Sequence, residues 1–187
     1  MSQDKDQDII ERVLGGERDA YGTLVDRYKG PIFNLAYRMT GSSQDADDLT
    51  QDTFIRAYAA LRSFKKGSKF FTWLYTISLN LVRNHLKKGI PLQTLDSYCQ
   101  VPSREEAYNP EGCAIRQDDV RALNASLYRL PEILREAVVL RFYQGLSFED
   151  IAEASGGSLS SAKMNVYRGL EQLRVLMREE RPDQKTG

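Results

Sequence analysis

Hydrophobic residues recur at three- and four-residue spacing through most of the sequence, a pattern that predicts α-helices rather than strands. Near the start of the chain the pattern predicts a helix over residues 9–14, a second over 20–28 and a third over 32–39. We place the break between the second and third helices at Gly30-Pro31, because proline lacks the amide hydrogen that continues a helix. The predicted fold class is all-α.

A fourth helix is predicted over residues 44–61, and its polar side carries Asp48, Gln51 and Asp52. Acidic residues in the first turn of a helix interact favourably with the helix dipole, and this interaction alone can explain why Asp45 and Asp47 are acidic. The other three residues extend past that turn on one side of the helix. These three residues could therefore bind a protein partner with a basic groove, and the pattern alone does not decide between this role and an ordinary solvated helix face.

The fifth predicted helix begins at Lys69, inside a segment, residues 56–88, that holds eight Lys and Arg residues and no Asp or Glu. Polar side chains follow one side of this helix for about 27 Å, at about 1.5 Å per residue. They are Lys69, Thr72, Thr76, Asn80, Arg83 and Lys87. The preceding residues 63–68 are predicted to form a loop with Gly67 as its breaker and Ser68 as a candidate N-cap. A basic loop at a helix N-terminus favours anion binding.

Aromatic residues are interleaved with these cations, a combination that suits a nucleic-acid strand with its bases exposed. They are Tyr58, Phe64, Phe70, Phe71, Trp73 and Tyr75. Aromatic residues at helical spacing are also typical of a core, and a basic run is often only a solvated face. The concentration of cations in one acid-free segment of a chain with zero net charge favours nucleic-acid binding.

Helical periodicity stops after Lys88, and the following residues are rich in proline, serine and acids. We therefore predict two small helical domains, residues 1–89 and 116–187, joined by an extended linker over residues 90–115. Both cysteines, Cys99 and Cys113, fall in that linker.

The second half of the chain contains a predicted helix-turn-helix. Ser147 and Asp150 form a capping box that opens a short helix, Gly156-Gly157 ends it, and Ser158 caps the next helix. Two helices joined by a tight glycine turn are typical of this DNA-binding motif, although a plain helical hairpin has the same pattern. The second helix is predicted to present the following polar side chains, which suit base edges and phosphates: Ser160, Ser161, Lys163, Asn165 and Arg168.

Composition excludes several classes of protein. No apolar run approaches a membrane span, and the acidic N-terminal segment does not resemble a signal peptide. One histidine and two cysteines offer no ligand set for a metal, and no glycine loop suits a phosphate cofactor, so neither a metal, a cofactor nor a catalytic residue is predicted. We expect a cytoplasmic protein with reduced thiols, with a redox role for the cysteine pair left open.

Several motifs in this order together resemble a bacterial RNA polymerase sigma factor of the extracytoplasmic-function (ECF) group in the sigma-70 family. The resemblance is carried by DAYGTLVDRY, DADDLTQDTFIRAY, RSFKKGSKFFTWLYTISLN, NPEGC and LPEILREAVVLRFYQGLSFEDIAE. It covers nearly the whole chain and implies a non-enzymatic factor that binds core RNA polymerase and promoter DNA, both duplex and melted non-template strand. It also implies an anti-sigma factor that holds the protein inactive until a stress signal.

The resemblance assigns roles to individual positions. Asp48, Gln51 and Asp52 match the polymerase-docking helix. The positions that match minus-ten recognition and melting are Arg62, Phe64, Lys65, Lys69, Trp73, Thr76, Asn80, Arg83 and Lys87. The minus-thirty-five recognition helix is matched by Ser160, Ser161, Lys163, Asn165 and Arg168. This chain has Asn165 where the family usually has a basic residue, which removes one expected phosphate or guanine contact.

A different class of protein has a similar pattern. An autonomous helix-turn-helix regulator, with N-terminal helices that sense a ligand, would bind its operator without polymerase. A gel shift with the purified protein separates the two.

Overall fold

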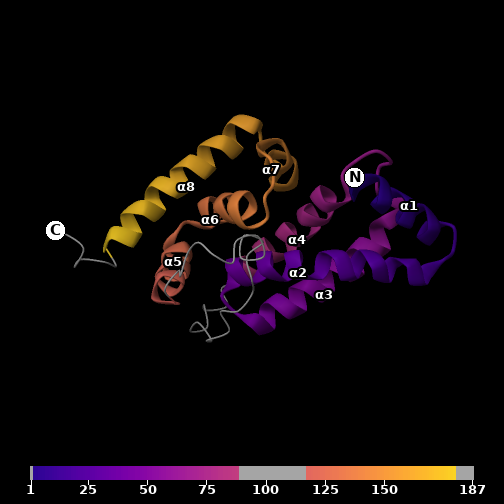
Figure 1. Cartoon of the computed structure of the whole chain (residues 1–187), viewed down its shortest axis with the longest axis horizontal. Coiled ribbons are helices and arrows are strands. Elements are labelled where there is room, and N and C mark those ends of the chain that lie inside the picture. The colour runs from indigo at the N-terminus through magenta and orange to yellow at the C-terminus, as the bar shows by residue number, and fades with distance from the viewer. Residues whose placement is uncertain (1, 89–116, 180–187) are drawn as a thin grey trace, which may run out of the picture.

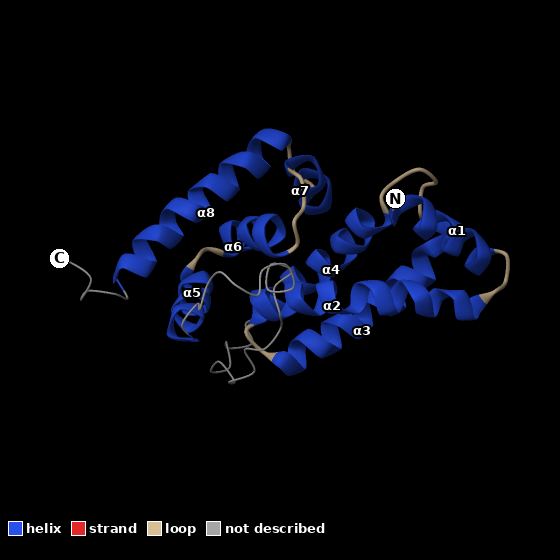
Figure 2. Cartoon of the chain, viewed as in Figure 1, coloured by secondary structure: helices blue, strands red, loops and turns tan. Residues whose placement is uncertain are grey.

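The computed structural model describes residues 2–88 and 117–179, and this part of the chain is helical with no strand (Figure 2). The predicted all-α class is therefore confirmed. The predicted linker, with Cys99 and Cys113, lies outside the described residues.

The first half contains four helices and two short 3-10 turns. The helices are α1 (Ser2–Leu14), α2 (Tyr21–Thr40), α3 (Ser43–Ala60) and α4 (Phe70–Lys87) (Figure 1). Helix α2 packs against both α3 and α4. Its end is set by Gly41 in the left-handed conformation (φ 78°), and Ser42 then caps α3 by accepting a hydrogen bond from the Asp45 amide.

The predicted break at Gly30-Pro31 is wrong, because α2 runs through Pro31 as one helix of 20 residues. A proline inside a helix costs about 3 kcal/mol, since it removes a hydrogen bond and crowds the preceding turn. Buried residues on both sides of the proline offset that cost: Leu24 precedes it, and Ile32 and Leu35 follow it, each with no exposed surface. Tertiary packing therefore outweighs the local signal.

The second half contains α5 (Gln117–Arg129), α6 (Glu132–Val138), a π-helical segment (Val139–Tyr143), α7 (Phe148–Ser155) and α8 (Leu159–Glu179). The predicted helix-turn-helix is α7 and α8. The Ser147 hydroxyl accepts from the Asp150 amide at the start of α7, and Gly156 (φ 72°) ends it. Ser158 and Ser161 then cap α8 reciprocally, each hydroxyl accepting from the other residue's amide.

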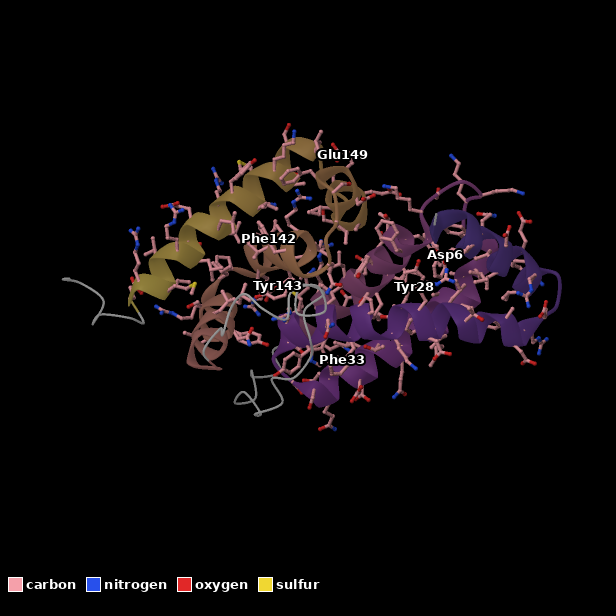
Figure 3. The ribbon with its side chains drawn as sticks, viewed as in Figure 1. Asp6, Tyr28, Phe33, Phe142, Tyr143 and Glu149 are labelled. Atoms are coloured by element: carbon pink, nitrogen blue, oxygen red, sulfur yellow. The ribbon has the colours of Figure 1, made fainter. Side chains whose placement is uncertain are left out.

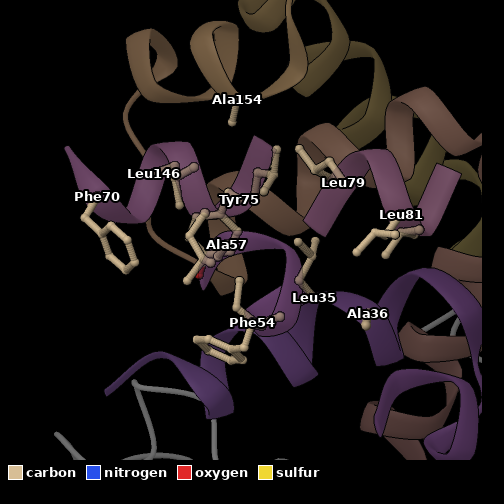
Figure 4. Close-up of a cluster of buried hydrophobic side chains, with 14 of the residues drawn as sticks. Leu35, Ala36, Phe54, Ala57, Phe70, Tyr75, Leu79, Leu81, Leu146 and Ala154 are labelled. Carbon is tan, nitrogen blue, oxygen red and sulfur yellow. The ribbon is translucent and has the colours of Figure 1, made fainter. Parts of the chain in front are cut away.

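The two halves share a buried core. Leu146 and Ala154, from the second half, lie beside Tyr75 and Leu79 of α4 (Figure 4). Helix α7 lies along α4, and α5, α6 and the π-helical segment contact α2 (Figure 1). Tyr143, labelled in Figure 3, also contacts α2, because the guanidinium carbon of Arg38 lies 3.5 Å from the centre of its ring.

Candidate nucleic-acid interface

Three surfaces contain the residues that the sequence singles out. The first is on α3, where Asp48, Gln51 and Asp52 are all exposed and lie on one side of the helix, as predicted. We call these three residues the docking stripe. Ile55 continues it one turn further and is 66% exposed, an unusual amount for so large an apolar side chain.

A hollow of about 590 Å³ opens beside the stripe. Its walls include Tyr21, Phe54, Ile55 and Tyr58, with the rings of Tyr21 and Tyr58 in edge contact. Acidic side chains next to an apolar hollow suit a protein partner with basic and apolar residues. The acidic pattern alone did not predict the apolar part of this surface.

The second surface is the loop before α4 and α4 itself. Gly67 breaks the loop in the left-handed conformation (φ 87°), as predicted. The predicted cap at Ser68 is wrong: Lys69 is the N-cap residue, and its side chain makes no capping hydrogen bond. Arg62 and Lys65 are exposed, and Lys66 is held by Glu11 of α1 at 2.6 Å.

The aromatic residues of this region form a cluster that is mainly core. Phe64 is 9% exposed, and its ring meets the edges of Phe70 and Trp73 at centroid distances of 5.7 and 5.3 Å. Phe70 is buried, whereas Trp73 is only partly covered. Of the three rings, Trp73 is the one placed to meet a base without rearrangement. Contact of Phe64 with DNA stays a prediction and requires the loop to move.

One side of α4 is open to solvent. Asn80 and Lys87 are exposed on this side, and Thr76 lies at its edge with its hydroxyl bonded to the Thr72 carbonyl. Asn80 lines a hollow of about 220 Å³ between α3 and α4. The walls of the hollow are Arg56, Ala60, Ile77, Asn80, Leu81 and Asn84. Two amides and a guanidinium around an apolar floor can hydrogen-bond the edge of a base and cover its face.

The adjoining part of the same polar side is covered by the second half of the chain. Lys69 Nζ is 2.8 Å from Asp150 Oδ1 of α7, and Thr72, beside the same carboxylate, has no exposed surface. Arg83 donates two hydrogen bonds to the Glu136 carboxylate of α6, at 2.8 and 2.6 Å. The polar stripe predicted on α4 is thus divided, with one part open and one part paired to carboxylates of the same protein.

Asp150 is nearly buried, with an 8% exposed side chain. Burial alone would raise the pKa of its carboxyl, but hydrogen bonds from Lys69 and Ser147 outweigh burial and lower that pKa below its ordinary value. Asp150 is therefore held as an anion beside Lys69, the residue that precedes α4.

The third surface is the outer side of α8. Ser160, Lys163 and Arg168 are exposed, and Ser161 and Asn165 lie at its edges, half-buried. The buried side consists of Ala162, Val166, Gly169, Leu173 and Leu176. The five predicted residues thus lie on or beside one strip that is exposed to solvent.

Two apolar residues lie on this strip and were missed from the sequence. Met164 is 45% exposed and Tyr167 is 63% exposed, and both lie on the side opposite the buried residues. Large apolar side chains at the middle of a recognition surface can contact the thymine methyl group. The sequence could have identified them from helical periodicity: around the helix axis, Met164 lies about half a turn from Ala162, and Tyr167 lies about half a turn from Gly169.

The described residues contain no group of three or more His, Cys, Asp or Glu placed to hold a metal. None of the described helices is long and apolar enough to cross a bilayer.

Comparison with known proteins identifies the family. The sequence matches Sigma-70 region 2 over residues 24–89 and Sigma-70 region 4 over residues 121–173. It is 31% identical to the RNA polymerase sigma-H factor of Pseudomonas aeruginosa, over 96% of this chain and 99% of that protein. It is 32% identical to the ECF RNA polymerase sigma factor SigW of Bacillus subtilis, over 91% and 95%. The chain belongs to the ECF group of sigma-70 factors, which are transcription initiation factors rather than enzymes.

Two solved structures share the fold. CnrH in complex with the cytosolic domain of CnrY matches with a TM-score of 0.69 and 27% identity, covering 94% of this chain and 98% of that one. The sigma factor RpoE, in complex with the anti-sigma factor NepR from Bartonella quintana, matches with a TM-score of 0.63 and 24% identity. It covers 80% of this chain and 92% of that one. Family membership decides between the two classes predicted from the sequence, in favour of the sigma factor.

Proposed function

We propose that this protein docks on core RNA polymerase through the docking stripe, melts the minus-ten element along α4 and reads the minus-thirty-five element with α8. The observation that best supports melting is the hollow at Asn80, which lies on the open side of α4 and has hydrogen-bonding groups from two helices. In this proposal residues 1–89 serve docking and melting, and residues 116–187 serve duplex recognition.

Capture of an unpaired base is the proposed source of melting. Extruding a base costs a few kcal/mol, and stacking on an aromatic ring recovers about 1 to 3 kcal/mol. One unpaired base stacked on the exposed part of Trp73, and another in the Asn80 hollow about two helical turns further along α4, together stabilise a bubble that thermal opening supplies. Arg62, Lys65 and Lys87 add phosphate contacts from exposed positions. The polymerase provides the chemistry of RNA synthesis.

Recognition of the minus-thirty-five element is assigned to the exposed strip of α8. Lys163 and Arg168 provide cations for phosphates or guanine, and Ser160, Ser161 and Asn165 provide adaptable hydrogen bonds. Met164 and Tyr167 add the apolar contacts that the polar residues lack.

An anti-sigma factor is the proposed regulator, acting in the cytoplasm until a stress signal releases the protein. Two solved relatives support this, because each was determined in complex with another protein: CnrH with CnrY, and RpoE with the anti-sigma factor NepR. The exposed Ile55 and Tyr58 beside the docking stripe offer an apolar area for such a partner.

Run-off transcription on genomic fragments tests the proposal. Core polymerase with this protein should start transcripts at defined sites, whereas neither component alone should do so. A gel shift with the purified protein should give no tight complex with the same fragments. Tight, sequence-specific binding without polymerase, and no defined transcripts with it, would instead indicate an autonomous regulator.

Reversing one charge of the docking stripe tests the docking site. We expect Asp52→Lys to weaken binding to core polymerase in a pull-down by about ten-fold, because it places a cation against a basic surface. Asp47→Lys is the matched control: Asp47 is exposed on the same helix but lies off the stripe, so binding should stay near wild type. Equal weakening by both variants would mean that only net charge matters.

A further inference from the structure

The exposed strip of α8 has an apolar residue at its centre. Ser160, Met164 and Arg168 recur at four-residue spacing and form one row on the helix surface, about 6 Å apart at about 1.5 Å per residue. Met164 is the middle residue of this row and is 45% exposed. A thioether side chain therefore lies between a hydroxyl and a guanidinium on the surface proposed to read duplex DNA.

The backbone that presents Met164 is held in place by α7. Phe148 of α7 lies against two neighbours of Met164: its ring centre is 5.9 Å from Lys163 Nζ and 6.2 Å from the centre of the Tyr167 ring. The reciprocal cap of Ser158 and Ser161 fixes the first turn of the same helix. Met164 therefore projects from a rigid element, which sequence-specific recognition requires.

The charge around Met164 favours nucleic acid as the occupant of this surface. Between residues 159 and 170 the charged side chains are Lys163 and Arg168, with no Asp or Glu, and both cations are exposed. The next acid along α8, Glu171, is 3.7 Å from Arg174. Phosphates complement such a surface, whereas a second copy of the same surface would be repelled by it.

The chemistry of the base edges selects the group that Met164 can contact. Of the groups that base pairs present in the major groove, only the C5 methyl of thymine is apolar. The others exchange hydrogen bonds with water and would lose them against a thioether, which is a weak acceptor and no donor. A polar edge opposite Met164 is therefore disfavoured, and a thymine methyl is favoured because contact removes apolar surface from water.

We infer that Met164 is a specificity-determining residue of α8 that reads the C5 methyl of one thymine in the minus-thirty-five element. Base pairs are about 3.4 Å apart, so this thymine lies within about two base pairs of the base or phosphate that Arg168 contacts. The inference rests on the proposed role of α8, and it adds a base identity that the polar residues of the strip do not specify.

Deoxyuridine tests this inference, because it pairs as thymidine does and lacks only the C5 methyl. The complete protein with core polymerase is assayed on a promoter found by run-off transcription, in which each thymine of the minus-thirty-five element, on either strand, is replaced singly. Promoter affinity is measured by competition in a gel shift of the polymerase complex. Loss of one buried methyl contact corresponds to about a four-fold change in affinity, so one replacement should weaken binding of the wild type by that factor.

The variant Met164→Ala assigns the methyl to its reader. It should bind the unmodified promoter about four-fold more weakly than wild type and lose nothing further when the same thymine is replaced, because the two changes remove one contact. Met164→Leu keeps an apolar side chain and should stay sensitive to the methyl. Val175→Ala is the matched control: Val175 is 46% exposed on the same helix but about 16 Å further along, so this variant should match wild type at every position.

The outcomes separate this inference from the proposed function. If scrambling the minus-thirty-five element abolishes binding but no thymine in it is methyl-sensitive, or the element holds no thymine, the role of Met164 is overturned and α8 remains the reader. Equal methyl sensitivity in wild type and Met164→Ala would also overturn it, by assigning the contact to another residue. Binding that survives the scrambled element would contradict the proposed role of α8 itself.

Discussion

Valine in place of Gly169 is expected to lower the melting temperature by about 10 °C. Gly169 lies where α8 crosses α6, and an added Cβ would be 2.6 Å from Val138 Cγ2 and 3.1 Å from the Leu134 carbonyl oxygen. Val138 is β-branched and 2% exposed, so it cannot turn away. Overpacking of this kind costs about 3 kcal/mol and displaces α8, which carries the residues proposed to read the minus-thirty-five element.

Gly22→Val is the matched control for that measurement. Gly22 is also inside a helix, α2, but a Cβ added there meets nothing within 4 Å. Thermal melting followed by circular dichroism should therefore give Gly22→Val a melting temperature near wild type. Equal melting temperatures for the two variants would show that α6 and α8 do not pack as closely as described.

The second large loss of stability is expected from substitution of Arg135, a residue that joins the ends of two helices. Its guanidinium donates to the Met39 carbonyl in the last turn of α2 at 2.8 Å, and to the Tyr128 and Leu130 carbonyls at the end of α5 at 2.9 and 3.2 Å. Carbonyls at a helix C-terminus lack partners within the helix and favour a cation. Burial lowers the pKa of this guanidinium, with smaller opposing effects from Tyr128 and Glu132.

Replacing Arg135 with methionine should destabilise the protein by about 3 kcal/mol, because three carbonyls, two of them in buried contacts, lose a charged donor. Arg135→Lys should recover only part of the loss, since a single ammonium cannot reproduce the planar fork. The measurement is the midpoint of urea unfolding. Arg174→Met is the control, because Arg174 pairs with Glu171 on the surface, both about two-thirds exposed, and should change stability by less than about 0.5 kcal/mol.

A buried ion can also be replaced by an apolar side chain at no cost. An Arg135→Met variant as stable as wild type would thus show that the three hydrogen bonds of the guanidinium add no net stability. In that case Arg135 would not be the link between α2 and the second half.

Local sequence signals predicted the parts of the fold that depend on neighbours in the chain. The caps at Ser147 and Ser158 and the stop at Gly156 lie within one helical turn of the residues they bind, so they are visible in the sequence. The exposed docking stripe likewise follows from the phase of α3.

Features set by distant residues could not be predicted in this way. The pairs Lys69–Asp150 and Arg83–Glu136 join residues more than fifty positions apart, and neither has a periodic signature. Without them, the polar stripe of α4 was expected to be open along its whole length. Continuity of α2 through Pro31 was missed for the same reason, because packing against α3 and α4 overrides the local preference.

Permanganate reactivity of unpaired thymines, at a promoter found by run-off transcription, tests most directly whether α4 holds separated DNA strands. With core polymerase and the Asn80→Ala variant, we predict that thymine reactivity falls about ten-fold while polymerase binding in a pull-down stays at the wild-type level. Asp52→Lys should instead lose both together. Full thymine reactivity with Asn80→Ala, or an equal loss of polymerase binding, would contradict the assignment of α4 as the strand-separating surface.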